Sequence, residues 1–148
     1  MTIHSAAEFV RLRTSEVAAD YHRAATEPAP IEVWMDVIDS RPDMRFWVAH
    51  NKAVPVAVLE RLASDDDPRV RAMVARRRAA GATLLADLAH DLDDGVRAEV
   101  ARNPRSPRSA LLELAADPVQ VVAEAARGRL DGRISDSGPV RMVPTTSE

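Results

Sequence analysis

DDGVRAEVARN, residues 93–103, is one of three full versions of the same phrase in this chain. DDPRVRAMVARR (residues 66–77) precedes it by one repeat and SRPDMRFWVAHN (residues 40–51) by two. The alanine after the second apolar residue recurs every 26 residues, and a shorter fourth version follows one residue early: Ala49, Ala75, Ala101 and Ala126. An internal period between about 20 and 50 residues is typical of repeat arrays. The chain is therefore predicted to consist of repeated supersecondary units.

Each repeat contains the signals for two short helices. In SPRSALLELAAD (residues 106–117), Ser106 is a predicted N-cap and Pro107 a predicted first helical residue, followed by a leucine stripe. In the second helix, Val96 and Val100 lie four residues apart on one face after an acidic cap. Helices this short are unstable alone, so their apolar faces must stack. We predict an all-α fold, a right-handed α-solenoid (alpha-alpha superhelix) of short helix pairs.

The two ends of the chain depart from the period. Residues 1–30 do not fit the repeat, and the capping box SAAE (residues 5–8) opens a helix there, so we predict an N-terminal helical cap. Residues 31–131 are assigned to helical repeats of about 26 residues. Residues 132–148 show no period and collect Ser, Thr, Gly and Pro, which predicts a disordered tail.

The recurring phrases resemble those of HEAT-like helical repeats, and most closely those of the leucine-rich-repeat variant family. The residues that carry this resemblance are DDPRVRAMVARR and DDGVRAEVARN, followed by the serine-proline-leucine phrase of residues 106–117. The resemblance covers roughly residues 30 to 130 and implies a binding scaffold. Some members of that family carry a cysteine-ligated iron–sulfur cluster. This chain contains no cysteine, so the cluster is not expected here.

The composition restricts the chemistry. The chain has 148 residues, the length of one domain, and a formal net charge of −3. Without cysteine it has no disulfide, thiolate metal site or thiol nucleophile. No two histidines have metal-ligand spacing, and no phosphate-binding glycine motif or nucleophile motif occurs. We therefore expect no cofactor, no metal and no enzymatic activity. The absence of a long apolar segment or signal peptide predicts a cytoplasmic protein that does not enter the membrane.

Several polar columns are predicted to be structural. Arg45, Arg71 and Arg97 each lie six residues after an aspartate, an arrangement that HEAT-like repeats use to tie one repeat to the next. Asn51 and Asn103 follow the repeat alanine by two residues, where we predict a helix C-cap whose backbone has the left-handed conformation. Trp34 takes a leucine position and is predicted to lie in the core.

The candidate site lies in the stretch RFWVAHNKAVP, residues 45–55. Trp47 shares its column with Met73 and Glu99, which leaves two interpretations open. It is either an exposed aromatic on the binding face or a cover for the core beneath the cap. The second helices begin acidic and end basic, so stacking would align their basic ends into a stripe. The candidate partner-binding residues are Trp47, His50, Lys52, Arg76, Arg77 and Arg78.

Two classes of partner fit such a stripe. A protein partner, bound through the concave or basic edge in a regulatory or toxin-neutralising role, is the first prediction, because Trp and Arg are common interface anchors. Nucleic acid, bound through the arginine stripe, is the alternative. A monomer or weak dimer is expected.

Overall fold

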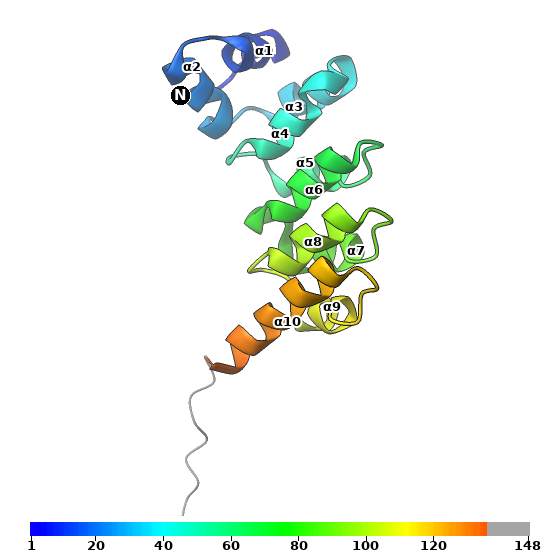
Figure 1. The fold of residues 1–148 in the computed structure, drawn as a ribbon. Coiled ribbons are helices and arrows are strands. Elements are labelled where there is room, and N and C mark those ends of the chain that lie inside the picture. Colours follow the sequence, from blue (N-terminus) through cyan, green and yellow to red (C-terminus); the bar gives the residue numbers. More distant parts are fainter. Residues whose placement is uncertain (136–148) are drawn as a thin grey trace, which may run out of the picture.

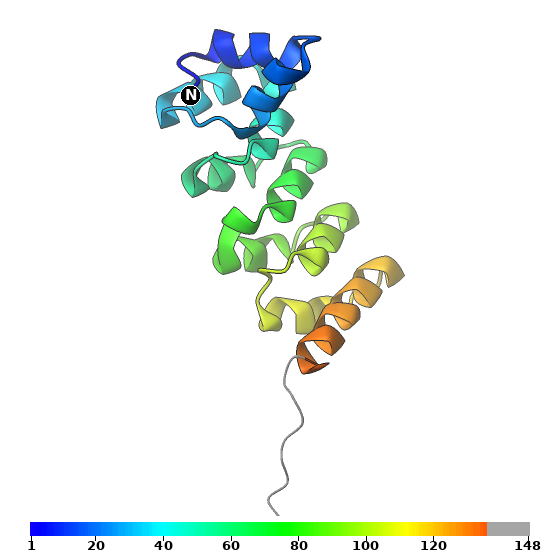
Figure 2. The same ribbon diagram turned by 90° about the vertical axis from the view of Figure 1, so that its left-hand side faces the viewer.

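The computed structural model describes residues 1–135, which form ten α-helices, two short 3-10 helices and no β-strand. The helices stack along one axis into an elongated array (Figure 1). Figure 2 shows the same stack from the side, with the N-terminal helices at one end and the last helix at the other. The prediction of an all-α fold is confirmed for these residues.

The helices follow the predicted 26-residue pattern from residue 31 onward. Their bounds are α1 (Ala6–Thr14), α2 (Ala18–Thr26), α3 (Ile31–Ser40), η1 (Pro42–Met44), α4 (Arg45–His50), α5 (Val56–Leu62), α6 (Pro68–Arg76), η2 (Arg78–Ala80), α7 (Gly81–Leu88), α8 (Asp94–Arg102), α9 (Arg108–Leu114) and α10 (Gln120–Ser135). Within each repeat the odd-numbered helix comes first. The second helices α4, α6, α8 and α10 pack in succession against one another.

Helix α10 runs through Ser135, four residues past residue 131, where the repeats were predicted to end. The rest of the predicted tail, residues 136–148, lies outside the described residues.

The core consists of the residues that define the repeat. Trp34 is fully buried, which confirms its predicted place, and it forms a T-shaped ring pair with Phe9, with centroids 5.3 Å apart. The recurring alanines are also fully buried, where a side chain this small lets neighbouring second helices approach closely. The buried members of the alanine and leucine columns are Ala49, Ala75, Ala101, Ala126, Leu59, Leu62, Leu85, Leu88, Leu111 and Leu114.

Helices α1 and α2 pack on the first repeat. The backbone amide of Ile3 donates to the Pro28 carbonyl at 2.8 Å, and the Lys52 amide donates to the Ala25 carbonyl at 2.8 Å. The second bond joins the end of α2 to the residue just beyond α4. The N-terminal helices are thereby attached to the surface that carries the candidate site.

Two predicted caps are corrected by the structure. Pro107, not Ser106, is the N-cap of α9, and the buried Ser106 hydroxyl donates instead to the Val100 carbonyl at 2.5 Å. Asn51 and Asn103 do terminate α4 and α8, but their backbones are extended, with φ of −61° and −69°, rather than left-handed. The extended backbone points each amide side chain at the neighbouring repeat, which is the partner that the helix signal alone did not reveal.

Candidate functional site

Arg71 joins two successive repeats. Its Nε donates to Asp91 Oδ2 at 2.8 Å and its Nη2 to Asp91 Oδ1 at 3.0 Å, a bidentate pair with the next repeat. Its Nη1 donates to the backbone carbonyl of Asp65, in its own repeat, at 2.8 Å. One guanidinium therefore links the start of α6 to the start of α8.

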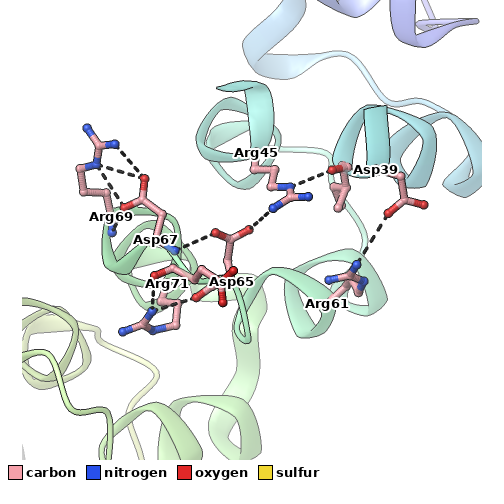
Figure 3. Close-up of polar contacts among 9 residues, drawn as sticks. Asp39, Arg45, Arg61, Asp65, Asp67, Arg69 and Arg71 are labelled. Carbon is pink, nitrogen blue, oxygen red and sulfur yellow. Dashed lines mark hydrogen bonds and ion pairs between the residues drawn. The ribbon is translucent and has the colours of Figure 1, made fainter. Parts of the chain in front are cut away.

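The same linkage occurs along the array with a spacing of 20 residues between arginine and aspartate. Arg97 binds Asp117 at 2.7 Å and Arg45 binds Asp65 at 3.5 Å. Figure 3 shows Arg45 and Arg71 on either side of the loop that carries Asp65. The predicted ladder is thus confirmed between repeats. Asp39 is the exception, because its carboxylate is exposed and forms only a 3.6 Å pair with Arg61.

The carboxylates of Asp91 and Asp117 are held in their ionised form. Burial raises the pKa of Asp91, but hydrogen bonds from Arg71 and from the Asp93 amide outweigh it and leave the pKa below its ordinary value. The hydrogen bond from Arg97 similarly lowers the pKa of Asp117. Carboxylates with these partners stabilise the array and are poorly suited to act as general acids.

Asparagines form a second set of links at the opposite helix ends. The Asn51 amide donates to the carbonyls of Ala24 and Glu27, each at 2.9 Å, and its oxygen accepts from the Ala53 amide at 2.7 Å. Asn103 repeats this pattern with the carbonyls of Ala75 and Arg77, at 2.6 and 3.0 Å. Each asparagine therefore satisfies carbonyl groups at the end of the preceding second helix.

Arg77 occupies the asparagine position at the end of α6. Its Nη1 donates to the His50 carbonyl at 3.2 Å, while its buried Nε has no hydrogen-bond partner within the described residues. Burial lowers the pKa of Arg77, which shows that its charge is poorly solvated. Arg77 is therefore partly buried between repeats and forms fewer hydrogen bonds than Asn51 and Asn103 do.

Trp47 is neither freely exposed nor fully buried. The Arg13 guanidinium from α1 lies 3.3 Å from its ring centroid, a cation–π contact. The rings of Tyr21, Phe46 and His50 surround it at centroid distances of 6.4, 4.9 and 5.7 Å. Trp47 thus joins α4 to α1 and α2. It packs beneath the N-terminal helices, as one interpretation of the sequence proposed, and remains partly exposed, as the other did. Sequence reasoning missed Arg13 and Tyr21 because they lie outside the repeat period.

Cations converge on His50 at the end of α4. Burial lowers the pKa of His50, and the charges of Arg77, Arg13, Arg76 and Lys52 lower it further, in that order. Arg13 comes from α1, Arg76 from the end of α6, and Lys52 follows α4. We call His50, these four cations and Arg78, which follows Arg77 in the chain, the basic edge. The structure therefore brings together four of the predicted residues, and a positive potential acts on the histidine.

The exposed cations of the basic edge differ in their partners. Lys52 is exposed and forms no ion pair within residues 1–135. Arg76 is exposed and approaches Glu99 at 3.7 Å, and Glu99 is shared with Arg102 at 3.5 Å. Arg78 is exposed at the start of η2 and is not among the charges that act on His50. Glu99 therefore limits the positive surface on the side of α8.

The described residues contain no group of three or more His, Asp or Glu side chains that could hold a metal ion. None of the helices in residues 1–135 is both long and apolar enough to cross a lipid bilayer.

The stacked helix pairs and the two sets of inter-repeat links define an α-helical repeat protein. Residues 94–119, which contain α8 and α9, match the model of the leucine rich repeat variant family. The resemblance inferred from the recurring phrases is confirmed over these residues. No curated protein and no solved structure matches the chain.

Proposed function

We propose that this protein is a non-enzymatic scaffold that binds an acidic segment of a protein partner at its basic edge. The cations around His50 carry this proposal: Arg77 donates to the His50 carbonyl at 3.2 Å, Arg13 lies 3.3 Å from the centroid of the adjoining Trp47 ring, and the charges of Arg76 and Lys52 also act on His50. A carboxylate-bearing partner would relieve the mutual repulsion of these charges. In the arrangement we propose, the array is a right-handed solenoid, residues 1–30 form its cap, and the basic edge borders its concave side.

The predicted site residues have different roles in this proposal. Lys52, Arg76 and Arg78 are exposed and would contact the partner, since their guanidinium and ammonium groups are accessible. Arg77 would contribute through its charge, because its side chain is partly buried and bound to the His50 carbonyl. Trp47 would hold the site together through Arg13 and offer only its exposed edge to a partner.

A protein partner is favoured over nucleic acid by the extent of the charge. Glu99 pairs with both Arg76 and Arg102 and neutralises part of the positive charge beside the basic edge, while the next exposed arginines without an ion pair in the described residues, Arg105 and Arg127, lie further along the array. Nucleic-acid affinity depends on a row of phosphate contacts, and non-specific binding comes almost entirely from them. A short positive patch beside aromatic rings fits a carboxylate-rich protein segment better.

Fluorescence anisotropy with two probes tests the proposal. A labelled peptide rich in Asp and Glu should bind, and the variant Lys52→Gln/Arg78→Gln should weaken binding by about tenfold or more. The variant Arg61→Gln/Arg69→Gln loses the same charge from exposed side chains at the end of α5 and the start of α6, away from the basic edge, and should bind normally.

A labelled single-stranded DNA tests the alternative. Tighter binding of the DNA, with affinity that falls log-linearly and steeply between about 50 and 200 mM salt, would replace the proposal with nucleic-acid binding. Equal effects of the two double variants would place the function on another surface. Affinity capture with the wild-type chain and the Lys52→Gln/Arg78→Gln variant would then identify partners that depend on the basic edge.

A further inference from the structure

The middle repeat differs from its neighbours at the start of its first helix. Pro55 and Pro107 are the N-caps of α5 and α9, with φ of −72° and −68°. Gly81 stands in the same sequence column but is the first residue of α7, after the N-cap Ala80, and has a φ of +76°, the only positive φ within residues 1–135. Proline cannot adopt this conformation, and glycine adopts it without strain. The entry into α7 therefore follows a different path from the entries into α5 and α9.

A groove lies between α5 and α7 at this irregular repeat. Its volume is about 630 Å³, within the range of roughly 300–1,000 Å³ that is typical of ligand sites. Ala63, Ala80, Leu84 and Leu88 supply its apolar lining. Leu84 is only partly buried, whereas Val58 and Ala110 at the same repeat position are 0% and 3% exposed. Leu84 is therefore accessible to solvent at a position where the equivalent side chains, Val58 and Ala110, are buried.

The polar residues that line the groove are acidic or neutral, apart from one histidine. Glu60 and Asp87 are exposed, and their carboxylates form no ion pair or side-chain hydrogen bond within the described residues. Asp91 is bound by Arg71, and His90 Nε2 lies 2.7 Å from Glu113 Oε2. No lysine or arginine lines the groove. Its free charge is therefore negative, opposite in sign to the basic edge.

We propose that this groove binds a protein segment in which an apolar residue is flanked by lysine or arginine. The apolar side chain packs on Leu84 and Leu88, and the basic side chains reach the free carboxylates of Glu60 and Asp87. Charge complementarity supports this occupant, because both carboxylates lack a partner of opposite charge and no cation in the lining competes for them. The groove is separate from the basic edge and selects partners of the opposite charge, so this inference does not depend on the proposed function.

Two-dimensional ¹H–¹⁵N NMR titrations of the full chain test this inference. The probe is a synthetic hexapeptide of alternating leucine and arginine, and the matched peptide has glutamate in place of arginine. The arginine peptide should shift the amide signals of Ala63, Leu84 and Leu88, and the glutamate peptide should leave them unchanged. Glu60→Lys/Asp87→Lys should weaken binding of the arginine peptide by about tenfold or more.

Two further variants control for charge and folding. Glu16→Lys/Glu32→Lys makes the same charge change at exposed residues outside the groove and should leave binding intact. Thr83→Trp fills the groove from an exposed lining position without changing the charge and should also weaken binding. The inference is wrong if the two peptides shift the same signals equally, or if the shifts map to the basic edge. It is also wrong if sedimentation shows self-association that Glu60→Lys/Asp87→Lys abolishes, because a second copy would then occupy the groove.

Discussion

Replacing Arg71 with alanine tests the links between repeats. The variant removes the bidentate pair with Asp91 and the 2.8 Å bond to the Asp65 carbonyl. The Arg71 and Asp91 side chains are only 18% and 9% exposed, so the loss leaves a largely buried carboxylate without its cation. Removal of one partner from a fully buried pair costs about 3–5 kcal/mol. Asp91 retains the hydrogen bond from the Asp93 amide at 2.9 Å, so we expect a smaller loss of about 2–3 kcal/mol.

Arg69→Ala is the matched control. Arg69 lies on the same helix and also forms a bidentate pair with an aspartate, Asp67, but its side chain is 83% exposed. An exposed pair of this kind contributes about 0–1 kcal/mol. Urea unfolding should be followed by far-UV circular dichroism, which reports on all helices, and by the fluorescence of Trp34 and Trp47, which reports on the N-terminal third. Equal losses for Arg69→Ala and Arg71→Ala would refute the assignment of the ladder as the main polar link.

Three other outcomes follow from the structure. Arg77→Asn should raise the free energy of unfolding by about 1 kcal/mol. Asparagine fits the extended backbone at this position and would donate to backbone carbonyls as Asn51 and Asn103 do. A loss of stability in the same urea melts would contradict this prediction. Trp47→Ala should lower the free energy of unfolding by about 2–3 kcal/mol, more than an exposed substitution does, because the ring holds Arg13 and Tyr21 against α4. A decrease below about 1 kcal/mol would show that these ring contacts contribute little to stability. The pKa values of Asp91 and Asp117 are lower in the folded state than the unfolded value near 4, so both carboxylates stabilise the fold fully above about pH 4. This stabilisation is lost as the pH falls through the pKa values of the folded state. Acid titration should therefore destabilise the wild type more than Arg71→Ala.

The periodicity made the architecture and the ladder predictable. Arg45, Arg71 and Arg97 repeat in register with the aspartates, so their structural role could be read from spacing alone. Spacing could not separate the two bonding partners of each arginine. The guanidinium binds the carbonyl of its own repeat and the carboxylate of the next, and this division depends on how closely the repeats stack.

The candidate site was only partly predictable. His50, Lys52 and Arg76 meet because successive second helices end side by side, as the recurring columns imply. Arg13 and Tyr21 come from helices outside the period, so no column placed them near Trp47. The sequence predicted Asn51 and Asn103 only as helix caps, because the carbonyl groups that their side chains bind lie more than 20 residues away in sequence. The groove is lined in part by Gly81, whose positive φ the sequence pattern did not indicate.

The titration of the His50 ring by NMR tests the binding of an acidic segment at the basic edge most directly. In the free protein, burial and the surrounding cations should hold the pKa of His50 below its ordinary value near 6.5. A bound acidic peptide places carboxylates beside those cations, so the pKa should rise and binding should strengthen as the pH falls from about 8 to 6. A His50 pKa that is the same with and without the peptide, while the peptide binds, would contradict the account.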